Sequence, residues 1–408
     1  MQLIATHSEK KKIVDQPVTF KVIRPAHHST KMEFGFRQKL IKWMMWMNIL
    51  MVAMKKFGSP RVAFSKTKQL RKLRDQYRNY RPPLKYSFTG NKYFVSYNTP
   101  AWPSKAFNNY ISHLLNRAMP ASQPSLHTLI FAITKKCGFQ CEHCCEWENL
   151  NKPEMLSRQD LLSIIRRFQE LGVSQVQLSG GEPLNRFDDI LFLLKNIREG
   201  TDFWLYTTGF QLTSEKAKLL KNHGLRGITI SLDHHDPELH DQFRGRKGAY
   251  GRALQAAQFA VDADLAVCFS LCATRQFISM ENLMKYAGIA RNAGASFIQI
   301  LEPKAVGHYA GHDVMLNEHQ TQILEQFFDS LNYDKAFSTY PVVSYHGYYS
   351  RRIGCSGSGK DYLYVDTDGD VHSCPFCQRK LFSAFDEALP EKINGMKMRG
   401  CSVNNIFK

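Results

Sequence analysis

The stretch TLIFAITKKCGFQCEHCC, residues 128–145, joins a short apolar run to four of the chain's ten cysteines. The run has the length and composition of a buried strand, and the cysteines follow it within a few residues. We expect no secretory signal, because the first apolar stretch comes only after roughly forty mostly polar and basic residues. An apolar fraction of 43% supports an ordinary core without crosslinks, so the cysteine spacing favours metal ligation or redox chemistry over disulfides.

Short apolar runs alternate with amphipathic, helix-like segments from residue 126 onwards. The runs cover residues 128–134, 175–180, 203–209, 227–233, 266–274 and 297–303. Six strands alternating with helices predict a parallel α/β domain, either an open sheet or a barrel. In such domains the chemistry lies at the carboxyl ends of the strands, and the cysteine cluster follows the first strand.

The positive charge of the chain is concentrated at its N-terminal end. The net charge is +18, but residues 1–125 alone hold 23 Lys and Arg against 4 Asp and Glu. The remaining residues therefore carry a net charge of only −1. We interpret residues 1–125 as a basic arm, followed by a nearly neutral catalytic or binding domain.

The arm contains a segment, LIKWMMWMNILMVAMKK (40–56), that is apolar on almost every side. Its apolar part, residues 43–54, would span only about 18 Å as a helix, against about 30 Å of membrane hydrocarbon. A spanning helix is therefore disfavoured. Three readings remain: a helix in the membrane interface with Trp43 and Trp46 at headgroup depth, a helix buried against the arm, and a partner-binding helix.

The rest of the arm has a readable local pattern. A basic, helix-like run at 61–80 could face anionic lipid or a nucleic-acid backbone. An extended segment, KYSFTGNKYFVSYN (85–98), with Gly90-Asn91 at its centre predicts a β-hairpin. Residues 99–117 predict a helix.

Cys137, Cys141 and Cys144 have the spacing C-x3-C-x2-C. On one loop, three thiolates can converge on an iron–sulfur cluster and leave one iron open to a further ligand. A zinc site would need a fourth ligand, for which Cys145 or His143 is a candidate donor. The spacing alone leaves both possibilities open.

A second motif, LSGGEPL (178–184), ends the second predicted strand. Gly180 and Gly181 leave backbone exposed for the close approach of a ligand, and Glu182 offers a carboxylate to an ammonium group. Together with the cysteine spacing, this motif resembles the radical S-adenosylmethionine (radical SAM) superfamily over residues 126–303. The family usually has an aromatic residue at His143, although an imidazole can also stack on adenine.

The resemblance implies a 4Fe-4S cluster that binds SAM and cleaves it reductively to a 5′-deoxyadenosyl radical, which abstracts hydrogen from a substrate. It implies an electron donor such as flavodoxin or ferredoxin, and an unidentified peptide, lipid-linked or small-molecule substrate. By position, the expected cofactor contacts are Gly180, Gly181 and Glu182 at the SAM amino group, His143 at adenine, Thr208 and Ser231 at ribose or carboxylate, and Arg244 at the carboxylate. For Thr208, Ser231 and Arg244, strand-end capping and surface ion pairing are the alternatives, and no catalytic residue is identified.

A second cysteine set lies near the C-terminus. It comprises Cys355, Cys374, Cys377 and Cys401, with a predicted hairpin turn at DTDG (366–369) between the first two. The pattern resembles the SPASM extension of radical SAM enzymes in its shortened Twitch form, which implies a second, auxiliary 4Fe-4S cluster. On chemical grounds alone a structural zinc site fits the four thiolates too. Cys268 and Cys272 are expected to be buried as small hydrophobes.

The predicted fold class is α/β, with a partial (β/α)6 radical SAM barrel at residues 126–335. A basic, α-rich N-terminal arm (1–125) precedes it, and a Twitch-like β-hairpin and helix extension (336–408) follows it. We expect a cytoplasmic enzyme, peripheral on the inner face of an anionic membrane.

Two other function classes compete with this one. They are a non-catalytic iron–sulfur redox sensor that binds nucleic acid through its arm, and a zinc-stapled nucleic-acid module. The intact GGEP motif beside the cysteine triad argues against the first, since a sensor has no use for a SAM pocket. Six βα units and a neutral core argue against the second.

Overall fold

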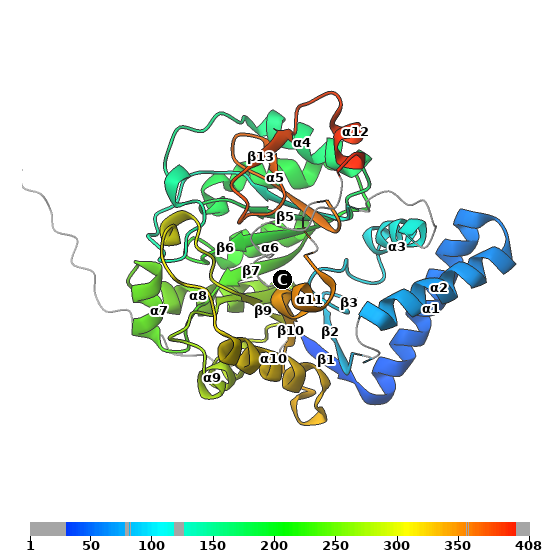
Figure 1. The fold of residues 1–408 in the computed structure, drawn as a ribbon, viewed down its shortest axis with the longest axis horizontal. Helices are drawn as coiled ribbons and strands as arrows, with labels where there is room; N and C mark the ends of the chain where they lie inside the picture. Colours follow the sequence, from blue (N-terminus) through cyan, green and yellow to red (C-terminus); the bar gives the residue numbers. More distant parts are fainter. Residues whose placement is uncertain are drawn as a thin grey trace, which may run out of the picture.

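The computed structural model describes residues 30–77, 81, 83–117, 126–355, 357 and 359–396. A curved sheet forms the centre of the molecule, helices cover its outer side, and a pair of helices projects from one edge (Figure 1). The predicted ligand Cys401 lies outside the described residues, as do the first 29 residues of the basic arm.

Ten strands form the main sheet, in the order β10-β9-β8-β7-β6-β5-β4-β11-β12-β13. The six strands predicted from the sequence are β4 (Thr128–Ala132), β5 (Gln175–Ser179), β6 (Asp202–Thr207), β7 (Leu225–Ser231), β8 (Ala266–Cys272) and β9 (Phe297–Leu301). Each is parallel to the next and lies beside it, in chain order. The predicted parallel α/β fold is confirmed, and the carboxyl ends of all six strands meet at one edge.

Helices pack their apolar faces against the outside of this sheet. They are α4 (Arg158–Glu170), α5 (Phe187–Asn196), α6 (Ser214–Asn222), α7 (Pro237–Arg244), α8 (Ala249–Asp262), α9 (Met280–Asn292) and α10 (Glu318–Tyr333). Five of these helices, α4, α6, α7, α9 and α10, begin with a polar side-chain cap, and α4 opens with a reciprocal capping box between Ser157 and Asp160. Leu, Ile, Val, Phe and Ala from these helices and from the strands form one continuous core.

The C-terminal segment extends the barrel sheet at both edges. It consists of β10 (Val342–Tyr345), α11 (His346–Ile353), β11 (Tyr362–Val365), β12 (Asp370–His372), β13 (Lys380–Ser383) and α12 (Leu389–Asn394). β10 pairs in parallel with β9, and β11 pairs in parallel with β4. The predicted turn at 366–369 joins β11 to β12, with Gly369 at φ +80°. The sheet thus runs across the domain boundary that we predict at 335/336. That boundary stays a prediction.

The arm forms a small layer of its own. Its elements are β1 (Lys31–Phe34), α1 (Gly35–Phe57), α2 (Pro60–Tyr77), β2 (Lys85–Thr89), β3 (Lys92–Phe94) and α3 (Lys105–Arg117). The hairpin turns at Gly90-Asn91 as predicted, with positive φ at both residues. β1 was not predicted, because its pairing with β2 joins residues more than fifty positions apart.

Helix α1 buries one face against the rest of the protein and leaves the opposite face exposed. The buried residues are Gln38, Ile41, Met45, Ile49 and Ala53, at the three- and four-residue spacing of one helix face. This face packs against α2 and α3, and the turn between α1 and α2 is capped by Gly58 in the left-handed region. The structure therefore supports the buried reading for one face of α1 only.

The end of the arm's hairpin plugs the amino-terminal side of the barrel. Phe94 and Tyr97 meet Trp204 and Phe297 edge-to-face, with ring centroids 5.0–6.1 Å apart. The Tyr97 hydroxyl lies 2.8 Å from the hydroxyl of Thr229 on β7. The arm and the barrel therefore share a buried core.

Across the described residues, no helix combines the length and apolarity that a membrane span requires.

The shared core makes a prediction about stability. Phe94→Ala should lower the free energy of unfolding by about 3–5 kcal/mol, because it leaves a cavity between the hairpin and the barrel. Urea denaturation followed by tryptophan fluorescence and circular dichroism measures this. The matched control Phe36→Ala, at a side chain that is 81% exposed, should change it by less than about 0.5 kcal/mol. An unchanged unfolding transition in Phe94→Ala would show that the arm and barrel are independent.

Candidate active site

The cysteine loop leaves the carboxyl end of β4 and is fixed by a residue that the sequence analysis did not single out. Asn151 sits at φ +61°, a conformation that Asn tolerates better than most residues. Its Oδ1 accepts from the Cys137 N–H at 3.1 Å, and its Nδ2 donates to the Cys137 carbonyl at 3.1 Å. Its own N–H donates to the Lys135 carbonyl at 2.8 Å. Asn151 therefore bonds to both the N–H and the carbonyl of Cys137.

The other end of the loop is held by a turn after β9, the short helix η3 (Gly307–Tyr309). The His308 N–H donates to the Cys144 carbonyl at 2.9 Å, and the His308 Nδ1 lies 3.0 Å from the Cys141 carbonyl oxygen. A Cβ at Gly307 would lie 2.2 Å from the Cys144 carbonyl, so only glycine permits this approach. No pattern in the sequence connects residues so far apart.

The glycines of the GGEP motif pack the end of β5 against the cysteine loop. The Gly181 N–H donates to the Thr134 carbonyl at 2.7 Å. A Cβ would lie 2.5 Å from the Thr134 carbonyl at Gly180, and 2.5 Å from the Lys136 carbonyl at Gly181. The glycines are thus needed for protein packing as well as for the predicted approach to a ligand.

The carboxylate of Glu182 is buried and surrounded by donors from the protein. Its Oε1 accepts from the Leu184 N–H and the Thr207 hydroxyl at 3.1 and 2.8 Å. Its Oε2 accepts from the N–H and hydroxyl of Thr208, at 2.8 and 2.6 Å. These four bonds fill the acceptor sites of a carboxylate and fix the end of β6. The predicted contact of Glu182 with an ammonium group stays untested.

Arg244, predicted to meet a carboxylate, already has a buried partner. Its Nε donates to Asp233 Oδ2 at 2.6 Å, and its guanidinium lies 3.5 Å from the Cys141 sulfur. Burial alone would lower the pKa of Arg244, but the Asp233 carboxylate and the Cys141 sulfur outweigh it and raise that pKa. The guanidinium of Arg244 therefore lies beside one ligand thiol, with its charge balanced by Asp233.

His143 is buried on the same side of the loop. Its ring stacks on Phe243, with centroids 4.8 Å apart and planes 9° from parallel. Burial, helped by the charge of Arg244, lowers the pKa of His143 to about 4, so the imidazole is neutral at pH 7. Among the described residues, its buried Nδ1 has no hydrogen-bond partner. A neutral, flat ring with an unused polar atom suits contact with a planar, hydrogen-bonding ligand.

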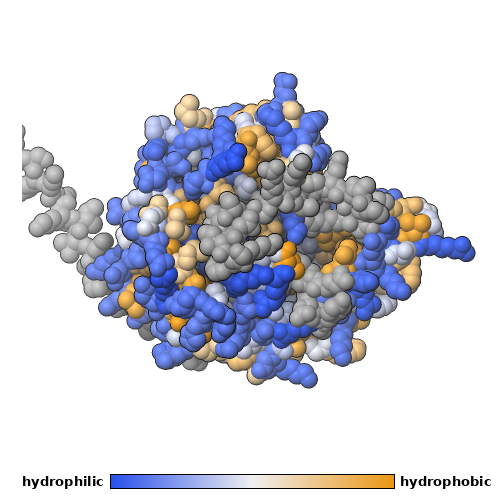
Figure 2. Space-filling model, in the orientation of Figure 1, coloured by the Kyte–Doolittle hydropathy of each residue, from blue (hydrophilic) through white to orange (hydrophobic). Residues whose placement is uncertain are grey.

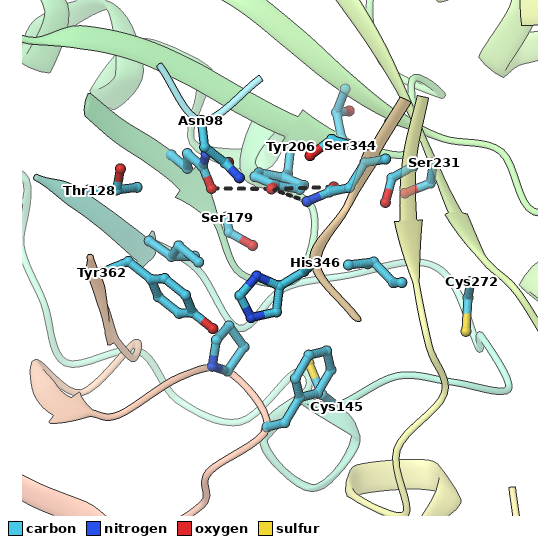
Figure 3. A pocket seen from close by; sticks show the side chains of 18 of the residues that line it. Asn98, Thr128, Cys145, Ser179, Tyr206, Ser231, Cys272, Ser344, His346 and Tyr362 are labelled. Atoms are coloured by element: carbon cyan, nitrogen blue, oxygen red, sulfur yellow. Dashed lines mark hydrogen bonds between the residues drawn. The ribbon is translucent and has the colours of Figure 1, made fainter. Parts of the chain in front are cut away.

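A cavity of about 440 Å³ lies within the barrel, beside the cysteine loop, and Cys145 of that loop is among the side chains that surround it in Figure 3. Most of the predicted cofactor residues line it together, namely Cys137, Cys141, His143, Cys144, Gly180, Gly181, Thr208, Ser231 and Arg244. Glu182 does not line it and acts behind the wall through Thr208. His234 and His235, in the turn between β7 and α7, do not line it.

The inner wall of the cavity carries neutral polar side chains, which sequence patterns did not reveal as a group. Tyr206 donates to Gln177 Oε1 at 3.2 Å and accepts from Gln299 Nε2 at 3.4 Å. The buried Gln177 Nε2 has no hydrogen-bond partner in the part of the chain that the structure describes. Burial raises the pKa of Tyr206 to about 12, so it remains a hydroxyl donor at neutral pH. In the sequence, this wall is indicated by polar residues at the strand positions whose side chains point into the barrel.

The C-terminal cysteine loop forms another wall of the cavity. Pro375 and Phe376, between Cys374 and Cys377, line it, and so does Cys145 (Figure 3). Cys355 is not among the lining residues, but it lies near this loop. Its sulfur accepts from the Gly357 N–H at 3.3 Å, and a Cβ at Gly357 would lie 3.0 Å from the Ser373 carbonyl, so Gly357 lies between Cys355 and the residue before Cys374.

The thiols of the first triad fit an iron–sulfur cluster in their chemistry. Burial raises the pKa of Cys137 to about 11 and that of Cys144 to about 12, so both need a bound metal to become thiolates at pH 7. Within the described ranges, no three His, Cys, Asp or Glu side chains are close enough to hold one metal ion. A cluster does not require that closeness, because each of its thiolates binds a different iron.

Cys268 and Cys272 are both buried, as predicted. Cys268 belongs to the core that the arm shares with the barrel, whereas Cys272 reaches the cavity.

The fold and this site define a radical SAM domain. Residues 131–285 match the sequence profile described as "Radical SAM superfamily", so the chain carries that domain. The fold of this superfamily binds SAM and a 4Fe-4S cluster. The substrate of this enzyme is not identified by the match.

Three relatives illustrate the similarity. An AdoMet-dependent heme synthase of Oleidesulfovibrio alaskensis is 24% identical, over 67% of this chain and 76% of that protein. The mycofactocin maturase MftC of Mycolicibacterium smegmatis is 27% identical, over 63% of this chain and 66% of that protein. The structure of Streptococcus suis SuiB bound to its precursor peptide SuiA shares the fold, with a TM-score of 0.56 and 15% identity over 82% of this chain and 78% of that one.

The Asn151 contacts predict how firmly the cysteine loop holds a cluster. Asn151→Ala removes both side-chain hydrogen bonds to Cys137 and disfavours the left-handed backbone. Iron should pass to a chelator about tenfold faster than from wild type, as followed by the loss of cluster absorbance. The control Asn149→Ala, whose side chain makes only a 3.5 Å bond to Glu146, should behave as wild type. Equal rates in all three proteins would contradict this role.

His240 predicts a pH dependence of stability. It is buried, its Nδ1 accepts from the Asp233 N–H at 3.1 Å, and burial lowers its pKa from 6.5 to about 4. Its contribution is fully present above pH 6.5 and is lost as the pH falls towards 4, because only the unfolded chain binds the proton there. The slope is about 1.4 kcal/mol per pH unit.

Urea unfolding of cluster-free protein at pH 5 and pH 7 tests this. His240→Asn keeps an acceptor for the Asp233 N–H and should flatten the dependence. Identical pH dependences in the two proteins would rule the contribution out.

Proposed function

We propose that the cavity holds a substrate between two iron–sulfur sites. The observation that carries this proposal is that one cavity is walled by the triad Cys137, Cys141 and Cys144 and also by Pro375 and Phe376 of the C-terminal cysteine loop. A group bound there would be within reach of both sites. The second site would be an auxiliary 4Fe-4S cluster on Cys355, Cys374 and Cys377, with Cys401 as the fourth ligand, which serves in electron transfer.

When bound, the first cluster and SAM supply a carbon-centred radical that abstracts hydrogen from a substrate, with the electron delivered by a donor such as flavodoxin or ferredoxin. The residues of the chain provide the geometry for this. Asn151 and His308 hold the cysteine loop, and Glu182 fixes Thr208 at the cavity wall. The Arg244–Asp233 pair sets the charge beside Cys141.

The part of the substrate that enters the barrel is proposed to be uncharged. The charged groups that line the cavity have partners in the protein: Asp233 pairs with Arg244, and the buried Lys85 donates to the Phe337 carbonyl at 2.7 Å. Glu146 accepts from the Tyr364 hydroxyl, and Asp361 lies 4.0 Å from the His127 Nε2. Tyr206, Gln177 and Gln299 instead offer neutral donors and acceptors, and the Gln177 amide has a donor left for the substrate. A peptide backbone presents such groups, and the names of two relatives, a maturase and SuiB with its precursor peptide, support a peptide substrate.

We propose in addition that the arm places this chemistry at a surface. The outer face of α1 takes no part in the cavity wall, whereas its buried Gln38 donates to the carbonyl of the wall residue Pro83 at 3.0 Å. The buried face of α1 therefore contacts the wall of the substrate site, and a surface that binds the outer face would lie on the other side of the same helix.

Variants of the two cysteine sets should differ in iron content and in SAM cleavage. Reconstituted without oxygen, the wild type should bind about eight iron and eight sulfide. Replacing Cys137, Cys141 and Cys144 with Ala should remove about half of the iron and all cleavage of SAM. Replacing Cys374 and Cys377 should remove the other half and leave reductive SAM cleavage detectable, because that cleavage needs only the first cluster.

The matched control is Cys268→Ala, a buried cysteine outside both sets, which should keep the full iron content. Zinc in place of iron after purification without oxygen would contradict the proposal. Equal loss of SAM cleavage in a folded Cys374 and Cys377 variant would make the C-terminal site structural.

A further inference from the structure

The outward face of α1 is a stripe of large apolar side chains without a protein partner in the described structure. Its members are Phe36, Leu40, Trp43, Met44, Met47, Met51 and Met54, each between 43% and 81% exposed. Single exposed apolar residues are ordinary on protein surfaces, whereas seven on one helix form a patch that marks an interaction site. We name this set the α1 stripe.

The α1 stripe is continuous and lies opposite the buried face of the helix. Its residues follow one another at spacings of three and four, apart from the adjacent pair Trp43 and Met44, so they project from one side. The buried residues, such as Met45 and Ile49, project from the other side. From Phe36 to Met54 the stripe extends about 27 Å along the helix. A helix with two apolar faces has one for its own fold and one for a partner.

The charge around the α1 stripe is strongly positive. Residues 33–75 contain eleven Lys and Arg against two acidic residues, Asp75 and Glu33, the second of which lies 3.8 Å from Arg37. Arg37, Lys39 and Lys55 are exposed on α1 and flank the stripe on its two sides. The apolar surface therefore has a cationic rim, which complements an anionic surface with an apolar interior.

The stripe is also accessible to a large flat surface. The α1–α2 hairpin projects from the body at the right of Figure 1, and hydrophobic residues are visible at the same edge in Figure 2. Trp43 is 61% exposed, whereas Trp46 lies under the Arg74 guanidinium, 4.7 Å from its ring centroid, and packs with the arm's core. Of the two tryptophans expected at headgroup depth, only Trp43 is placed to reach it.

We propose that the α1 stripe inserts into the interface of an anionic membrane, with α1 parallel to the surface. This deepens the proposed function by naming the surface, and rests on it only for the link to the substrate site. A second copy of the chain would bring two strongly basic hairpins together, which Coulomb repulsion opposes. A nucleic acid would satisfy the basic residues but leave the apolar stripe unused.

Vesicle sedimentation of the full-length protein tests the proposal without any need for activity. The wild type should bind vesicles of phosphatidylcholine mixed with phosphatidylglycerol and sediment far less with pure phosphatidylcholine. Binding should weaken at high salt, because screening removes the contribution of each basic side chain, about fivefold in affinity. Because cluster loading and SAM cleavage are measured separately, failure here leaves the proposed catalytic function standing.

Two variants separate the apolar and charged contributions. Trp43→Ser, Met47→Ser and Met51→Ser together should lower affinity at least about 100-fold at low salt, since apolar insertion is lost. Arg37→Gln, Lys39→Gln and Lys55→Gln together should lower it about 100-fold at low salt and flatten the salt dependence. These side chains are exposed on α1, so both variants should keep the wild-type circular dichroism and thermal midpoint.

The matched control changes three exposed apolar residues elsewhere, Met155→Ser, Leu239→Ser and Phe385→Ser, and should bind as wild type. Three results would overturn the proposal. The first is absence of wild-type binding to anionic vesicles. The second is unchanged vesicle binding in the serine variant of the stripe, which would point to a charge-only polyanion contact. The third is a wild-type dimer that the serine variant converts to a monomer, which would make a second copy the occupant.

Discussion

The candidate site depends on the junction between the ends of β4, β5 and β6. Backbone bonds from Gly181 and Glu182 to the Thr134 and Lys136 carbonyls attach the end of β5 to the cysteine loop. The Glu182 carboxylate then attaches the end of β6 through Thr207 and Thr208. A buried carboxylate is tolerated only when its acceptor sites are filled, so this one charge forces three loops into a fixed arrangement.

The arm and the catalytic barrel are mechanically connected. Phe94 and Tyr97 close the amino-terminal side of the barrel with buried aromatic contacts. On the other side of the arm, Gln38 of α1 bonds to Pro83, which is part of the cavity wall. A surface that binds α1 would therefore hold the substrate cavity at a fixed height above it, and this geometry relates the proposed membrane contact to the proposed chemistry.

Local sequence patterns correctly predicted the strands and turns that depend on residues close together in the chain. The six parallel strands, the hairpin at Gly90-Asn91 and the turn at Gly369 follow from apolar runs and from residues that accept positive φ. The strands β1 and β10 were missed because their pairings join distant segments, so no local pattern records them. For the same reason Asn151 and His308 were missed: each acts on cysteines that lie far from it in the sequence or in another loop.

The sequence by itself identified the radical SAM domain, because the spacing of Cys137, Cys141 and Cys144 and the GGEP motif place its characteristic groups on short segments. It also determined that the arm is basic and partly apolar. Only the tertiary structure decided that the second face of α1 is left exposed, because burial depends on which elements pack around the helix. It likewise decided that Glu182 acts behind the cavity wall and that Arg244 pairs with Asp233, because the partners of a buried charge are chosen by the folded surroundings and not by sequence neighbours.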